Sequence, residues 1–200
     1  ALQIFNEGNG ISLHLANPTE VGDVAKEIMA QINATLFQDP QSGKIKLKLA
    51  REDYVLADLP EFGPDEIEAI TDYSVTLWEQ TINVVRVAFT NRENSYADGI
   101  APQMDDGNIR FSGRQKTAMI KFPYLFDSAL AAELSAREMS NLSTPLFKAT
   151  LLMNRKSVVV GPGDPFKLTW PEYGLSQVVV RARKIGLGKK RNGKVTMQIV

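Results

Sequence analysis

The segment Asp127-Ser-Ala-Leu-Ala-Ala-Glu-Leu-Ser-Ala-Arg-Glu-Met139, followed by Leu142-Ser-Thr-Pro-Leu146, decides the fold class of this 200-residue chain. Asp127 or Ser128 is expected to cap a helix, because side-chain oxygens of these types accept the free amides of a first turn. Leucines recur behind this cap at positions 130, 134 and 142, which is helical spacing. Pro145 prevents a continuation of the helix. We therefore predict a helix over residues 128–142.

Short apolar segments follow this helix and predict a strand-rich remainder. Apolar and β-branched residues recur over 147–153, 166–170, 177–185 and 194–200, which we expect to form four short strands. The segment Val160-Gly-Pro-Gly-Asp164 carries turn-forming residues between the first two. Asn192-Gly193 suits a two-residue hairpin turn, because both positions tolerate positive φ. An antiparallel sheet after the helix is the expected arrangement.

The first fifty residues predict another helix and a hairpin. Asn17-Pro-Thr19 is a plausible helix start, and apolar residues at helical spacing predict a helix over 19–33. Strands at 35–38 and 44–49 flank a run of turn-forming residues. In Lys44-Ile-Lys-Leu-Lys-Leu49 the lysines and the apolar residues alternate, so they fall on opposite faces. The lysine face can meet phosphate, but we favour the alternative, a charged guard on an exposed edge.

The middle of the chain is less regular. Residues 56–65 contain Pro60, Gly63 and Pro64 and are the best candidate for a linker. Residues 67–77 are mixed, and we assign them no single state. Strands are predicted at 83–90 and 116–122. The polar, glycine-containing residues 91–113 between them are expected to form a long excursion.

These elements predict an α+β protein with two helices and antiparallel sheets, closed into small β-barrels. We expect an α+β segment at 1–60, with a helix and a hairpin, and a strand-helix-barrel segment at 61–200. The chain lacks an initiator methionine and stops within an expected strand at Thr196-Met-Gln-Ile-Val200. We therefore expect a fragment of a longer protein.

Composition excludes several classes of function. The chain has 23 basic and 23 acidic residues, and this balance argues against a dedicated nucleic-acid binder. It has no cysteine, which excludes disulfides and thiolate chemistry, and His14 is its one histidine, expected to point outward from a strand. No apolar run approaches the roughly 18 residues that cross a bilayer. The first residues lack the pattern of a signal peptide.

Several segments together resemble the family of phage tail proteins that includes tail-tip attachment proteins and the hub proteins of gene transfer agents. The resemblance begins near Val24 and covers most of the chain from there. Phe89 and Asn91 are departures, since the family often has tyrosine and aspartate at these places. The segments that carry it are Gln38–Tyr54, Trp78–Tyr96, Ala131–Arg137, Ser143–Leu146, Pro162-Gly-Asp164 and Lys167-Leu-Thr-Trp-Pro171.

The resemblance implies a structural role in a phage or prophage tail-tip or baseplate hub. Such hubs are homotrimers that form a ring around the tail channel, with two similar domains per copy. Their partners are other tail proteins, and DNA passes through the channel without being read. The resemblance further implies that the protein is located in the virion tail, and in the bacterial host cytoplasm before assembly. We expect no enzymatic activity, catalytic residue, cofactor or metal.

The candidate partner-contact residues are two aromatics and a basic cluster. Trp170 and Tyr173 lie in a loop between two strands, where they either contact a partner or cap the end of a barrel; we weigh these two equally. Lys189, Lys190 and Arg191 can bind DNA phosphates or acidic lipids, but a solvated hairpin tip is the favoured interpretation.

Two acidic segments receive a structural interpretation. Asp105-Asp-Gly-Asn108 lacks the alternating oxygen ligands of a calcium loop and is expected to be a loop tip. Asp65, Glu66 and Glu68 can be imagined as an acid/base pair, but acids at this place are ordinary for a helix start. Two alternatives to the structural role stay open: a host-receptor or glycan-binding module of the tail and, ranked last, a tail-associated hydrolase.

Overall fold

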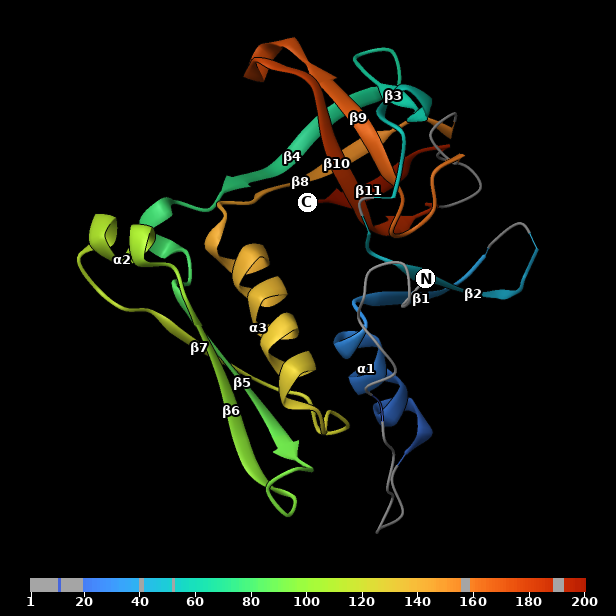
Figure 1. Cartoon of the computed structure of the whole chain (residues 1–200). Coiled ribbons are helices and arrows are strands. Elements are labelled where there is room, and N and C mark those ends of the chain that lie inside the picture. Colours follow the sequence, from blue (N-terminus) through green and yellow to red (C-terminus); the bar gives the residue numbers. More distant parts are fainter. Residues whose placement is uncertain (1–10, 12–19, 40–41, 52, 156–158, 189–192) are drawn as a thin grey trace. The chain divides into compact units, whose positions relative to one another are not determined.

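The computed structural model describes residues 11, 20–39, 42–51, 53–155, 159–188 and 193–200 (Figure 1). The chain forms two compact units, each built from two segments. Unit 1 comprises Ala1–Ile32 and Thr76–Pro145, and unit 2 comprises Asn33–Val75 and Leu146–Val200. The division expected after residue 60 falls inside unit 2.

Unit 1 contains a three-stranded sheet with a helix on one face. The central strand β5 (Val84–Asn91) is antiparallel to β6 (Ala97–Met104) and parallel to β7 (Thr117–Lys121). Helix α3 (Ser128–Ser143) packs against β5 and β6, as Figure 1 shows. The buried residues between them are apolar: Val85, Val87, Phe89, Phe122, Leu125, Ala131, Leu134 and Met139.

The helices begin largely where the sequence predicts. Asp127 caps α3, since its Oδ1 accepts hydrogen bonds from the amides of Ala129 and Leu130 at 2.8 and 3.0 Å. Helix α1 (Val21–Gln31) lies within the predicted 19–33, while its expected start at 17–19 and His14 lie outside the described residues. A side-chain hydrogen bond ties Tyr124 to Glu27 of α1 and, with burial, raises the pKa of Tyr124.

The long excursion predicted at 91–113 is wrong, because β6 and a third helix, α2 (Asp106–Ser112), occupy it. Gly99 suggested a loop, but it lies over the ring of Phe89, where an added Cβ would come within 2.8 Å of Cζ. Pro102 is tolerated because β6 is an edge strand. Asp105 caps α2 by accepting the amide of Asn108 at 3.0 Å, so this acidic segment is a helix start and not a loop tip.

Unit 2 contains a six-stranded sheet, which is curved into a half-barrel, and a separate hairpin (Figure 1). The hairpin pairs β1 (Ala34–Gln38) with β2 (Ile45–Leu49). Within the half-barrel the neighbouring strands are antiparallel except for one parallel pair, β3 with β9. The sheet order is β3 (Glu61–Phe62), β9 (Pro165–Trp170), β10 (Leu175–Gly186), β11 (Val195–Ile199), β8 (Phe147–Met153) and β4 (Ile67–Val75).

The α+β class and the four C-terminal strands are confirmed. Strand β4, in the stretch left unassigned, lacks clean alternation because it contains two irregularities, one between Thr71 and Ser74 with Asp72 at φ 52°. Strand β10 has a similar bulge, with Gln177 at φ 49°. Bulges break the period of two on which sequence assignment depends. The described residues also include the short 3-10 turns η1 (Leu56–Asp58), η2 (Trp78–Gln80) and η4 (Pro171–Tyr173).

Candidate assembly surfaces

The Pro162-Gly-Asp164 segment is a tight turn that holds unit 2 together. The amide of Gly161 donates to Asp164 Oδ2 at 2.7 Å, which closes the turn. Gly163 adopts φ 87°, a conformation that favours glycine. Its amide donates to the carbonyl of Ala182 at 2.7 Å, and the amide of Ala182 donates back to the carbonyl of Asp164 at 3.0 Å. The turn is thereby fastened to β10.

Arg181 joins this turn to the segment behind the hairpin. Its Nη1 donates to the carbonyl of Gly163 at 2.8 Å, and its Nη2 donates to the carbonyl of Arg51 at 2.9 Å. A guanidinium carries donors in a rigid fork, so one side chain can bind two carbonyls at once. Arg181 therefore works as a structural clamp within unit 2.

The lysine face of the hairpin lies against the same turn. Lys46 Nζ pairs with Asp39 Oδ2 at 2.7 Å, and Lys48 pairs with Asp164. Burial and, next, the positive charge of Arg181 lower the pKa of Lys48. These two lysines have carboxylate partners within unit 2, while their side chains stay 57% and 39% exposed. Exposed lysines on an edge strand are what the favoured interpretation, a charged guard, expects.

The opposite face of the hairpin is apolar and exposed. Directly paired residues share a face, and Leu36 pairs with Leu47 while Gln38 pairs with Ile45. The exposed fractions are 45% for Leu36, 74% for Ile45 and 54% for Leu47. We call these three residues the apolar hairpin face. Its exposure is unusual, because an amphipathic hairpin normally turns this face toward a core.

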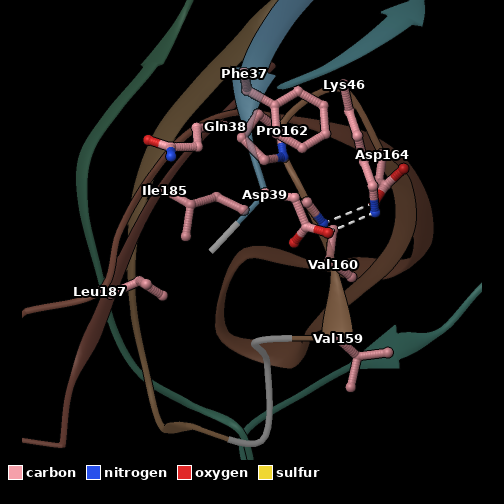
Figure 2. Close-up of a pocket in the computed structure, with 11 residues that line it drawn as sticks. Phe37, Gln38, Asp39, Lys46, Val159, Val160, Pro162, Asp164, Ile185 and Leu187 are labelled. Atoms are coloured by element: carbon pink, nitrogen blue, oxygen red, sulfur yellow. Dashed lines mark hydrogen bonds and ion pairs between the residues drawn. The ribbon is translucent and has the colours of Figure 1, made fainter. Parts of the chain in front are cut away.

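A cavity of about 300 Å³ lies between the hairpin and the half-barrel (Figure 2). Its two carboxylates are engaged: Asp39 accepts from Ser42 Oγ at 2.7 Å and pairs with Lys46, while Asp164 holds the turn. The charged groups of the cavity therefore stabilise the fold around it. The lining residues are Phe37, Gln38, Asp39, Lys46, Val159, Val160, Gly161, Pro162, Asp164, Ile185 and Leu187.

The two candidate aromatics take different positions. Trp170 is partly buried and packs against the core of the half-barrel. Tyr173 in η4 is 47% exposed, and its ring lies 4.8 Å from that of Tyr73. Tyr73 also contacts Phe147, with ring centroids 5.2 Å apart. Sequence reasoning missed Tyr73, which lies in the irregular part of β4 and carries no motif.

The three-stranded sheet of unit 1 has a second exposed apolar surface, on the face opposite α3. Ile100, Pro102 and Met104 project there from β6, since they pair with Ala88, Arg86 and Val84, which alternate with the core positions of β5. Met119 of β7 pairs with Arg86 and shares this face. Ile100, Met104 and Met119 are 54%, 48% and 62% exposed. We call Ile100, Pro102, Met104 and Met119 the outer sheet face.

The acidic candidates have structural contacts. Glu66 Oε2 accepts the amide of Gly63 at 3.2 Å, and Glu68 pairs with Lys194 at 2.7 Å. The described residues contain no group of three or more histidine, aspartate or glutamate side chains placed to hold a metal. Lys189, Lys190, Arg191 and Asn192 lie outside the described residues. Among the described helices, none is long and apolar enough to cross a membrane.

Comparison with known proteins identifies relatives of this fold. A family model described as “Putative phage tail protein” matches residues 20–185. A chain in the virion of a native gene transfer agent particle is similar, with a TM-score of 0.65, 14% identity, and coverage of 88% of this chain and 37% of that one. The tail protein of Neisseria meningitidis MC58 gives a TM-score of 0.62 and 10% identity, covering 94% and 56% of the two chains.

A third similar structure is the 43 kDa tail protein of prophage MuSo2 from Shewanella oneidensis, with a TM-score of 0.57, 12% identity, and coverage of 94% and 53%. The chain thus spans 37% to 56% of the length of these three solved proteins. No curated protein matches it significantly. At such low identity the structural likeness establishes the fold.

Proposed function

This chain belongs to the phage tail protein family, and we propose that it is a structural subunit of a tail-tip or baseplate hub, working as a homotrimeric ring around the tail channel. The observation that carries the proposal is the family match over residues 20–185, which extends through most of both units. The similar chain of the gene transfer agent virion, itself part of a multi-subunit particle, supports other tail proteins as partners.

The proposed mechanism is geometric. The subunit supplies surfaces that bind neighbouring copies and tail proteins, and the opening at the centre of the ring conducts DNA without reading it. A conduit must not hold DNA tightly, and the ion pairs of three lysines in unit 2 bear on that requirement. Lys46, Lys48 and Lys194 are each paired with a carboxylate of the same unit, which weakens their attraction for phosphate.

We further propose that the protein is not an enzyme, and that it resides in the virion tail after assembly from the host cytoplasm. The contacts of Glu66 and Glu68 support the first point, because both carboxylates stabilise strand ends of the half-barrel. A hydrolase would require two carboxylates that converge on a cleft.

A host-receptor or glycan-binding role is the second candidate, favoured by one observation. Tyr73 and Tyr173 form a half-exposed aromatic pair at the surface of unit 2, and exposed aromatics are frequent in recognition sites. Trp170 does not strengthen this case, since it packs against the core.

Light scattering after size exclusion, over a wide range of protein concentrations, tests the ring. We expect a mass three times that of one chain, or a reversible approach to it, followed by annular particles in electron micrographs. The measurement is made on this chain and on the native polypeptide with any flanking residues. A monomer in both forms overturns the ring, and binding of a host glycan by that monomer, lost in Tyr173→Ala, would favour the second candidate.

A further inference from the structure

The outer sheet face has two cations at its middle. Arg86 of β5 is exposed between Pro102 of β6 and Met119 of β7. Lys121 pairs with Ala88, two residues along β5 from Arg86, so both cations project from the same face. Neither side chain forms a hydrogen bond or an ion pair with the described residues. Unpaired like charges on neighbouring strands repel each other, and an anion brought to this face relieves the repulsion.

The surroundings of these cations are those of an interface core. Ile100, Met104 and Met119 are apolar and about half exposed. Arginine and methionine are enriched in protein interfaces, and arginine is often a residue that dominates the binding energy. Asp98 also projects on this side, opposite Thr90 near the start of β6, but it forms no ion pair with either cation. The face therefore fits a partner that brings apolar groups together with carboxylates.

A turn of unit 2 has the complementary composition. Its exposed residues, which we call the acidic turn, are Asp53, Val55, Leu56 and Asp58. Val55 is 64% exposed and Leu56 is 59% exposed, and the amide of Asp58 donates to the carbonyl of Val55 at 3.1 Å. Neither carboxylate forms a hydrogen bond or an ion pair with the described residues. The charge of Asp53 also acts on Lys48 of the hairpin, which has its own carboxylate partner.

Two other exposed apolar segments carry a different charge. Leu77 and Trp78 adjoin one carboxylate, Glu79, and Phe111 adjoins the cation Arg110. Each of these segments would leave at least one cation of the outer sheet face unpaired. The acidic turn supplies one carboxylate for each cation, with apolar side chains between them.

We propose that the acidic turn of one copy docks on the outer sheet face of a second copy of this chain, with its carboxylates beside Arg86 and Lys121. The proposal rests on the proposed function, since it names the surfaces that join the ring. The turn belongs to unit 2 and the face to unit 1, so every copy carries both halves of the contact. Two different patches on one chain make a head-to-tail contact, the type that closes into rings.

Charge reversal tests this contact, with assembly measured by light scattering. Arg86→Glu with Lys121→Glu should raise the concentration for half-maximal assembly tenfold or more, because carboxylates would then meet carboxylates. Asp53→Lys with Asp58→Lys should have the same effect. In both variants the melting temperature of the unassembled chain should be unchanged, since all four positions are exposed. The chain that carries all four substitutions should assemble again, because each charge pair is restored with its signs exchanged.

A matched control makes the same change in net charge elsewhere. Arg92→Glu with Arg110→Glu removes two exposed cations of unit 1 that lie outside the outer sheet face. This variant should assemble as the unsubstituted chain does. The comparison separates a local contact from a general effect of net charge.

Disulfide trapping tests the same contact without a change of charge, because the chain contains no cysteine of its own. One tagged copy carries Leu56→Cys and a second, differently tagged copy carries Met119→Cys. After mixing and mild oxidation we expect a disulfide-linked pair of the two tags. The matched control replaces Leu56→Cys by Val178→Cys, an exposed position in the same unit, and should give at least tenfold less linked pair.

The failures of the two proposals are distinguishable. A trimer that is insensitive to both charge reversals, or that forms without the Leu56–Met119 cross-link, overturns this docking and leaves the ring standing. Loss of assembly in both reversals without recovery in the fourfold variant also overturns it. So does a chain with both cysteines that links only within itself, because turn and face would then meet in one copy. A monomer at every concentration, with no cross-link, overturns both.

Discussion

Tyr73 and Tyr173 join the two sides of the half-barrel, with ring centroids 4.8 Å apart at an interplanar angle of 51°. Tyr73 comes from β4, one edge of the six-stranded sheet, whereas Tyr173 follows β9, which lies next to the other edge. The contact therefore bridges the open side of the curved sheet. Phe147 extends the cluster beside Tyr73.

Removing this bridge is expected to destabilise unit 2. Tyr73→Ala and Tyr173→Ala should each lower the free energy of unfolding by about 1–3 kcal/mol, because half-buried rings lose part of their apolar contact. The double variant should reveal a coupling of about 0.5–1.5 kcal/mol, as aromatic pairs do. Urea unfolding measures the free energy of unfolding of the two single variants and of the double variant. Val55→Ala, at a 64% exposed position, is the control, and strictly additive losses would contradict the bridge.

The clamp at Arg181 predicts that lysine cannot replace arginine at this position without a loss of stability. Arg181→Ala leaves the carbonyls of Gly163 and Arg51 without their donor and should cost about 2–3 kcal/mol of unfolding free energy. Arg181→Lys should recover less than half of that loss, since one ammonium cannot reproduce the fork. Denaturant unfolding is the measurement, and Arg183→Ala, exposed on the same strand, should be nearly neutral. Full rescue by lysine would exclude the clamp.

Asn83 anchors α2 in unit 1. Its side chain is fully buried and donates to Asn108, Ser112 and the carbonyl of Arg114, while its Oδ1 accepts the amide of Lys116 at 2.6 Å. Asn83→Ala leaves several of these groups unsatisfied and should cost about 2–4 kcal/mol.

Hydrogen exchange shows which part of unit 1 loses stability in Asn83→Ala. The amides of α2 and of the start of β7 should exchange faster in Asn83→Ala than in the unsubstituted chain, with α3 less affected. Asn94→Ala, in an exposed turn, is the matched control. Uniform acceleration across the whole of unit 1 would mean that Asn83 supports the unit globally and not α2 in particular.

The hydrogen bond between Tyr124 and Glu27 predicts a pH effect. Because the folded-state pKa of Tyr124 is raised above its usual value of about 10, its stabilising contribution is fully present below pH 10. The contribution is lost as the pH rises through the folded-state value. An absorbance titration of the phenolates should show one late tyrosine, shifted down in Glu27→Ala and unmoved in Glu20→Ala. No change in Glu27→Ala would refute the pairing.

Local patterns predicted the regular elements, and they failed where a local rule was overridden. The cap at Asp127 and the leucines behind it predicted α3, since both signals depend only on near neighbours. Strand β6 escaped prediction because Gly99 resembles a breaker, and only the ring of Phe89 on the adjacent strand shows why glycine is required. Strand β4 escaped because its bulge at Asp72 breaks the alternation.

The candidate surfaces were only partly predictable. Trp170 ends β9 and Tyr173 lies three residues later in η4, yet one packs on the core and the other is half exposed. Sequence spacing cannot distinguish them, because exposure depends on what other strands place nearby. The partner Tyr73 enters the cluster only through the curvature of the sheet.

The sequence by itself determined that the hairpin is amphipathic, with Ile45, Leu47 and Leu49 on one face and lysines on the other, because side chains alternate along any strand. Tertiary structure alone decided which face lies against the rest of unit 2. On the lysine side of the hairpin, Lys48 pairs with Asp164 and the ring of Phe37 lies next to Gly161. The apolar face is consequently turned outward. Alternation along a strand places the two sets of side chains on opposite faces, but contacts with residues far away in the sequence determine which face points outward.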